Sequence, residues 1–128
     1  MIKLIYIAAG GTIGTLFRYW LSGWMHKFAG GQFPWGTITV NLLGALIIGL
    51  AWGITQRISL PVNIRSLLFI GLFGGFTTFS TFVFEGLSLL KDDNIKLALA
   101  YIGISNIAGI LLVYAGYVLA NVLIQTLK

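Results

Sequence analysis

The nonapeptide GGFTTFSTF, residues 74–82, places phenylalanines and hydroxyl side chains side by side within a long apolar stretch. Phe79 and Phe82 are three residues apart, so a helix would present both rings on one face, with Ser80 and Thr81 beside them. An aromatic ring has a positive edge, and hydroxyl groups donate hydrogen bonds. These groups could therefore hold a small anion weakly enough for it to leave. The alternative is that the rings simply face lipid.

The same stretch predicts a break in its helix. Gly74 and Gly75 lower the helix propensity, and Thr77 and Thr78 lower it further. A break would free backbone carbonyl and amide groups in the middle of the apolar segment. Unwound backbone is tolerated at that depth only where protein or a water-filled cavity covers it, and there it commonly coordinates ions.

Other polar side chains stand singly in the apolar segments. Asn41 could serve a polar path or act as hydrogen-bonding glue between helices. Arg18 could extend to the lipid headgroups or supply a positive potential that concentrates anions. Threonine hydroxyls often bond only their own helix. Glu85, one turn after Thr81, is the only acid in these segments, which argues against an exporter driven by protons.

The composition is that of a membrane protein. Of the 128 residues 58% are hydrophobic and only 9% are charged, whereas soluble domains are about 25% charged. A fold of this length cannot hide so much apolar surface from water. The net charge of +5 comes from scattered cations without a basic run, so nucleic acid is not an expected partner. There is no cysteine, no nucleophile–base pair and no side-chain metal cluster, so we expect no enzyme.

The elements that would position these residues are four membrane-spanning helices in a single domain, residues 1–128. A span needs about 20 mainly apolar residues, and residues 4–24, 35–56, 66–90 and 97–124 meet that requirement. The runs are continuous and lack the period of two that a barrel needs. The N-terminal stretch is predicted to be the first span and not a signal peptide, since its apolar run is longer than that of a signal peptide.

The cations near the span ends give almost no orientation bias. Lys3, Arg57, Arg65 and Lys128 would lie on one side, and Lys27, Lys91 and Lys96 on the other. The chain could insert both ways, and the two orientations could then pair. Alternatively, Arg57 and Arg65 set one orientation.

Small residues four apart occur on three of the expected spans, as Gly10 and Gly14, Gly49 and Gly53, and Ser105 and Gly109. This spacing lets helix backbones approach closely. The contacts could form within one chain or between subunits. Four short helices enclose little volume for a water-filled path, which favours a dimer.

The nonapeptide, together with GTIGTLFRYW at residues 11–20 and GTITVNLLGALIIG at residues 36–49, resembles the Fluc (CrcB) fluoride channels over essentially the whole chain. The resemblance implies an all-α membrane protein with a broken third helix, forming an antiparallel dual-topology homodimer. It implies passive export of fluoride from the cytoplasm through two pores per dimer. We expect such a chain in a bacterial inner membrane.

The resemblance also implies roles for particular residues. Those expected along the fluoride pathway are Asn41, Phe79, Ser80, Thr81, Phe82, Glu85, Tyr101 and Ser105. Arg18 would lie in a vestibule. The backbone carbonyls of Gly74 and Thr77, doubled across the dimer, would hold a structural sodium ion at its centre.

Two other functions remain possible from the residues alone. A dual-topology small multidrug exporter would need a carboxylate in the first span, and residues 4–24 contain none. A non-transporting assembly subunit would need only the small-residue contacts. That hypothesis does not explain why Asn41, the predicted helix break and the neighbouring hydroxyls occur together.

Overall fold

The computed structural model describes residues 1–126 and is helical throughout that range apart from its short connections. The long helices are α1 (Ile2–Ala29), α2 (Trp35–Thr55) and α6 (Ile95–Thr126). The third segment is divided into α3 (Val62–Arg65), η1 (Ser66–Leu72), α4 (Phe73–Phe76) and α5 (Phe79–Lys91). Lys128, counted above among the flanking cations, lies outside the described residues.

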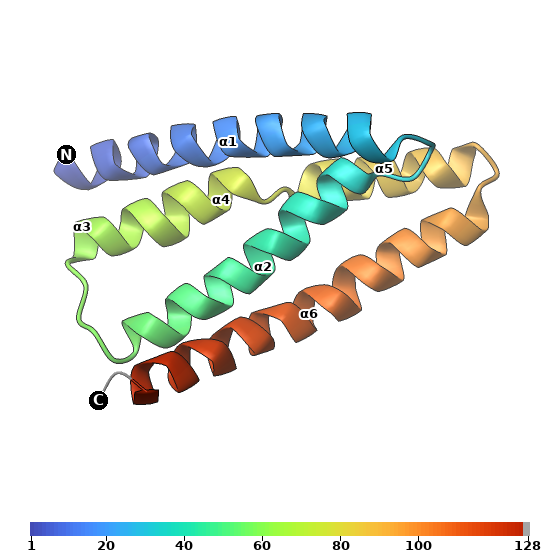
Figure 1. Ribbon diagram of the computed structural model, residues 1–128. Coiled ribbons are helices and arrows are strands. Elements are labelled where there is room, and N and C mark those ends of the chain that lie inside the picture. The colour runs from blue at the N-terminus through green and yellow to red at the C-terminus, as the bar shows by residue number, and fades with distance from the viewer. Residues whose placement is uncertain (127–128) are drawn as a thin grey trace.

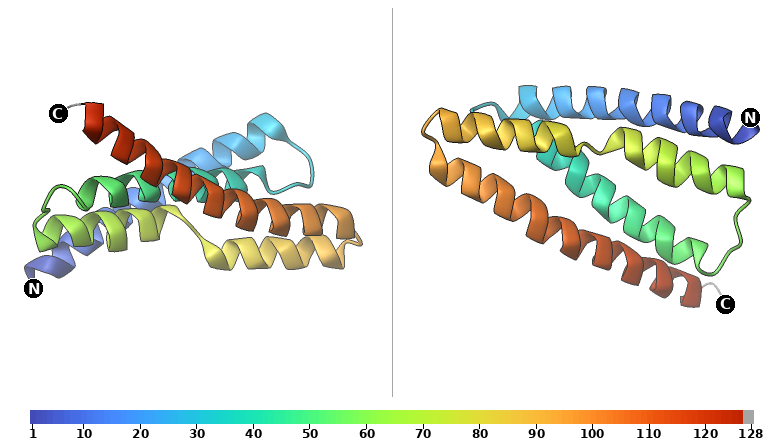
Figure 2. Two further views of the ribbon diagram at one scale, coloured as in Figure 1. Left: turned by 90° about the horizontal axis from the view of Figure 1, so that it is seen from below. Right: turned by 180° about the vertical axis from the view of Figure 1, so that it is seen from behind.

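The helices form a single antiparallel arrangement (Figure 1). The helix α1 runs along α3, η1 and α4, while α2 crosses diagonally and packs along α6. The further views show the same neighbours and a gap in the ribbon coil between α4 and α5 (Figure 2). The run from α3 through α4 is continuous, and η1 within it has the wider π-helical turn.

Three segments of the described chain are long and apolar enough to cross a membrane: Trp35–Thr55, Val62–Lys91 and Ile95–Thr126. They contain the expected spans at residues 66–90 and 97–124 and all but the last residue of 35–56. The expected span at residues 4–24 lies within α1, which has 28 residues but is not among the three.

Glycines bring α1 into backbone contact with the third segment. A β-carbon at Gly10 would collide with the carbonyl oxygen of Leu67, and one at Gly14 with that of Leu72. From the opposite side, a β-carbon at Gly75 would lie 2.6 Å from the carbonyl oxygen of Gly11. Backbones this close leave no room for any side chain, so van der Waals packing holds the pair.

Of the other two small-residue pairs, only one packs against another helix of the same chain. Gly49 and Gly53 pack α2 against α6, where added β-carbons would meet Val113 and Ala120. Gly109 has open space around its α-carbon. Two of the three predicted pairs therefore pack within the chain, and their spacing is not in itself an argument for a dimer.

The predicted break is present, but the glycines do not form it. Gly74 and Gly75 are helical and belong to α4. The backbone becomes extended at Thr77 (φ −91°, ψ 156°) and Thr78 (φ −145°, ψ 117°). Branching at the β-carbon favours extended backbone at these threonines, whereas Gly75 is needed for close approach to α1. The break thus lies at the threonines of the predicted stretch, and the role expected for the two glycines is corrected.

The core is small and lies between α2, α5 and α6. It contains Ile38, Leu89, Ala98 and Tyr101, with Phe33 and Phe82 packed against it. Large apolar side chains cover the exterior, as at Phe79 and Ile110, which are 77% and 72% exposed. An exterior of this kind suits lipid rather than water.

Candidate functional site

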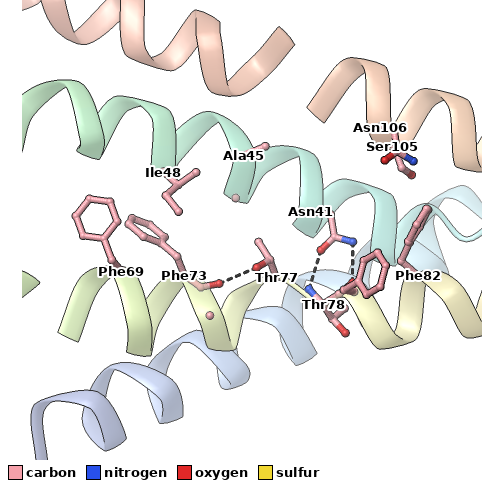
Figure 3. Close-up of a pocket in the computed structure, with 13 residues that line it drawn as sticks. Asn41, Ala45, Ile48, Phe69, Phe73, Thr77, Thr78, Phe82, Ser105 and Asn106 are labelled. Carbon is pink, nitrogen blue, oxygen red and sulfur yellow. Dashed lines mark hydrogen bonds between the residues drawn. The ribbon is translucent and has the colours of Figure 1, made fainter. Parts of the chain in front are cut away.

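The broken segment is held by the side chain of Asn41, which projects from α2 toward the extended residues (Figure 3). Its Oδ1 accepts from the backbone N–H of Thr78 at 2.8 Å, and its Nδ2 donates to the carbonyl oxygen of Thr78 at 3.0 Å. The amide thus satisfies both main-chain groups of an extended residue, as a neighbouring strand would. One of the two Nδ2 hydrogens remains for another acceptor.

The break leaves several main-chain carbonyls without their helical donors, those of Gly74 and Thr77 among them. In a continuous helix the N–H of Thr78 would bond the carbonyl of Gly74, and that of Thr81 would bond Thr77. Instead Thr78 N–H bonds Asn41, and Thr81 N–H bonds Thr78 Oγ1 at 3.4 Å. The carbonyls of Gly74 and Thr77 are the two that the resemblance assigns to sodium. Such oxygens are suitable ligands for a hard cation.

A cavity of about 390 Å³, here called the first cavity, opens beside the break. It brings together six of the residues singled out from the sequence: Asn41, Gly74, Thr77, Phe79, Phe82 and Ser105. Thr78 and Asn106 line it as well, and Figure 3 shows Asn41 of α2 beside the broken segment, with Ser105 and Asn106 on the neighbouring helix. Among the residues that the structure describes around this cavity, none is charged.

The paired phenylalanines sit at one end of the first cavity. The ring centroids of Phe79 and Phe82 are 5.9 Å apart, with 43° between the planes. Phe82 is half-buried and lies 5.1 Å from the ring of Tyr101, whereas Phe79 is largely exposed. The two rings do share one side of α5, as predicted, but only Phe82 is fixed by packing within the chain.

Ser105 contributes an unpaired donor to the same cavity. Its Oγ is buried and has no hydrogen-bond partner within residues 1–126. A buried hydroxyl without a partner is costly and calls for an explanation, such as an ion or water that binds there. The neighbouring Asn106 instead donates to the carbonyl of Ile102 on its own helix at 2.8 Å.

Glu85 is the centre of a second cluster of polar side chains, which lies toward the loop at residues 30–34. Its Oε1 accepts from Thr37 at 2.9 Å, and its Oε2 accepts from the hydroxyl of Tyr101 at 2.8 Å. Tyr101 is fully buried and also packs edge-on against Phe33, at 5.7 Å. Both oxygens of the carboxylate are therefore held by donors from different helices, which fixes α5 relative to α2 and α6.

A second cavity, of about 590 Å³, lies on this side. Thr37, Thr81 and Glu85 line it, and so do His26 and Asp92. Thr78 lines the first cavity and Thr81 the second, and their Oγ1 atoms are joined by a 2.9 Å hydrogen bond. This hydroxyl pair therefore forms a polar connection between the two cavities.

Two predicted residues lie apart from these groups. Ser80 is exposed and Arg18 is half-buried on α1, and neither lines the first or the second cavity. Within one chain the structure thus joins Asn41, Phe79, Phe82 and Ser105 at one cavity, and Thr81 with Glu85 at the other. Tyr101 belongs to the second group through its hydrogen bond.

Sequence reasoning missed two residues as members of the site. Thr37 binds Glu85, and its spacing of four from Asn41 placed both on one face of α2. Thr78 caps α5 and connects the cavities. Its role depends on a contact with α2 that no local pattern in the nonapeptide contains.

Comparison with known proteins identifies the family. The family model described as "CrcB-like protein, Camphor Resistance (CrcB)" matches residues 5–117. A relative from Parabacteroides distasonis, named "Fluoride-specific ion channel FluC", is 38% identical over the full length of both chains. Relatives of the same name from Solidesulfovibrio magneticus and Leptospira interrogans are 43% and 46% identical, over 94% and 89% of this chain and 98% and 91% of theirs. The chain, with its apolar helices, is a multi-pass membrane protein that belongs to the CrcB family.

Proposed function

We propose that this chain forms a fluoride-selective ion channel that lets fluoride leave the cytoplasm passively. The observation that carries the proposal is the first cavity, which is uncharged, offers hydrogen-bond donors and contains the unpaired Ser105 Oγ. The printed names of the relatives support the identity of the ion. The chain is not an enzyme.

The cavity provides the chemistry that a small, strongly hydrated anion needs. The free Nδ2 hydrogen of Asn41 and the Ser105 hydroxyl can donate to the ion as water leaves it. The edges of Phe79 and Phe82 add weak positive potential. Because no lysine or arginine lines this cavity in the described chain, binding stays weak enough for the ion to leave.

The route proposed for the ion runs between the two cavities past the hydroxyls of Thr78 and Thr81. Thr81 and Glu85 form its polar part on α5, with Tyr101 orienting the carboxylate. Ser80 and Arg18 line neither cavity of one chain, so they belong to the pathway only where a second chain completes it. Arg18 then serves as the vestibule cation.

The functional unit proposed is a homodimer of chains inserted in opposite directions, each with four spans, residues 1–128 forming one domain. The nearly balanced cations support free insertion, and the exposed Phe79 and the open side of Gly74 offer a surface for a partner. Such a dimer has two pores. We place it in a bacterial inner membrane.

A structural sodium ion at the dimer centre is part of this proposal. Among residues 1–126 no group of His, Cys, Asp or Glu side chains is arranged to hold a metal, so main-chain oxygens are the ligands to consider. The carbonyls of Gly74 and Thr77 lack their helical donors and are hard oxygen ligands. When bound, sodium would supply positive charge that ties together the two broken segments.

The test is fluoride efflux from liposomes that contain the purified full-length chain, followed with a fluoride electrode. We expect rapid efflux driven by the membrane potential, with chloride far slower. Chloride efflux at the same rate would contradict the selectivity. Efflux that requires a proton gradient and a cationic drug would support the multidrug exporter instead.

A further inference from the structure

A separate polar cavity lies where α2 ends and α3 begins, and it shares no residue with the first or second cavity. It has a volume of about 330 Å³, and its lining residues are Thr55, Gln56, Arg57, Ser59, Leu60 and Arg65. Two arginines thus line one small space, together with Thr55 and Ser59. We call it the loop cavity.

Arg65 is held in position by an aromatic ring. Its Cζ lies 5.6 Å from the centroid of Trp52, a distance typical of a cation–π contact. A guanidinium group that stacks on a ring can still offer the paired N–H donors of its edge to a ligand. Arg57 supplies a second cation to the same space.

The acidic side chains of the protein lie elsewhere. Glu85 is in α5, and Asp92 and Asp93 follow that helix. In Figure 1 this part of the chain is at the opposite end of the molecule from the loop that joins α2 to α3. The loop cavity therefore keeps a concentrated positive potential.

The surroundings of the loop cavity favour a lipid over a free ion. Ile58 and Val62 are 54% and 68% exposed beside the arginines, and Trp52 is 42% exposed. Tryptophan is enriched at membrane–water boundaries. The loop also joins two segments that are apolar enough to span a bilayer, so it meets the headgroup layer, where phosphates are abundant.

We propose that the loop cavity binds the phosphate group of an anionic phospholipid. Guanidinium groups bind phosphate oxygens with paired, charge-assisted hydrogen bonds. Ser59 adds a hydroxyl donor, while Ile58 and Val62 contact the upper part of the acyl chains. The site anchors the loop at the membrane surface and does not depend on which ion the protein conducts.

The test uses the full-length protein in detergent and measures retained phosphatidylglycerol by native mass spectrometry. We expect the double variant R57Q/R65Q to weaken binding about tenfold or more, since each cation near an anionic lipid contributes about 1 kcal/mol, or about fivefold in affinity. The control K91Q/K96Q removes the same charge beside Asp92 and Asp93, and should change binding less than about threefold. Equal loss in both variants would overturn the proposal.

Two further arms complete the test. Inorganic phosphate at millimolar concentration should not displace the lipid; if it does so and itself stabilises the protein against heat, the ligand is free phosphate and the lipid assignment is wrong. The single variants R57Q and R65Q cover a failure of the double variant to assemble. Unchanged phosphatidylglycerol binding in both singles would refute the site, and size-exclusion chromatography verifies that each variant is folded.

Discussion

The carboxamide of Asn41 takes the place of the helical partners that Thr78 lacks. Both main-chain groups of Thr78 bond this one side chain, at 2.8 and 3.0 Å, across 37 residues of sequence. The contact bridges the break between α4 and α5, and the same side chain lines an uncharged cavity. In Asn41 a structural role would therefore coincide with the proposed ion-binding role.

The variant N41D tests the proposed role of Asn41 in transport, and it also removes the donor to the Thr78 carbonyl. Aspartate keeps the acceptor for Thr78 N–H but loses the donor and adds a negative charge, which at close range opposes an anion by several kcal/mol. We expect fluoride efflux to fall about 100-fold or more. Size-exclusion chromatography should show the same assembly as for the original chain. The control N121D makes the same change where the amide bonds only Tyr117 of its own helix. Equal losses in both variants would contradict the assignment.

The phenylalanine pair predicts a loss of transport without a loss of assembly. Isoleucine has no positive ring edge, so F79I and F82I should each abolish measurable fluoride efflux. F82I also removes packing on Tyr101 and should lower the free energy of unfolding by about 1 kcal/mol or more, whereas Phe79 is too exposed for a comparable effect. F84I is the control, since Phe84 is 68% exposed on the same helix and lines neither cavity. Normal efflux in F79I and F82I would exclude the rings from the mechanism.

Local sequence properties were enough to predict the helices and the existence of the break. Continuous apolar runs predicted the long segments, and low helix propensity predicted an interruption in the third. Propensity alone did not show that the break would spare the two glycines and fall on the threonines. The position of the break depends on Gly75, which must stay helical to meet Gly11, and on Asn41, which bonds Thr78.

Residue types were enough to predict several of the residues that belong to the candidate site. They did not predict that these residues divide between two cavities. Asn41, Phe79, Phe82 and Ser105 do line one cavity. That Glu85 binds Thr37 and Tyr101 on two other helices follows from tertiary packing, for which a single sequence carries no signal. Ser80 shows the opposite failure: its place in the nonapeptide suggested a role, yet it is exposed in one chain.

The contact between α1 and the third segment predicts a strong difference between two neighbouring glycines. In G14A the new methyl group would collide with the main chain of η1 at Leu72, and overpacking of this kind costs about 1–3 kcal/mol. In G11A the methyl group meets nothing within 4 Å. We expect thermal unfolding in detergent to show a lower midpoint for G14A only. A midpoint lowered equally in G11A would contradict the packing.

Ser105 predicts opposite effects on stability and transport. Its buried hydroxyl has no partner within the described chain, so S105A removes an unsatisfied group and should leave the free energy of unfolding unchanged or raise it by about 1 kcal/mol. Loss of a donor to a charged ion should lower fluoride efflux about tenfold. The control T12V removes a hydroxyl that bonds only its own helix. If S105A conducts as well as T12V, the hydroxyl does not contact the ion.

If fluoride passes the hydrogen-bonded hydroxyls of Thr78 and Thr81, removing the Thr78 hydroxyl should slow transport. In T78V the methyl group replaces Oγ1, so α5 loses its N-terminal cap, worth about 1 kcal/mol, and the two cavities lose their shared hydroxyl pair. The variant T78S keeps both. We expect fluoride efflux to fall about tenfold in T78V, as expected for the loss of one hydrogen bond to a charged ion, and to stay near the original rate in T78S. The variant T77V is the control, because Thr77 Oγ1 bonds only Phe73 of its own segment. It tests whether the loss of any hydroxyl near the break lowers fluoride efflux. If T77V and T78V lose transport to the same extent, a change in the stability of the break would explain both, and the route through Thr78 and Thr81 would be wrong.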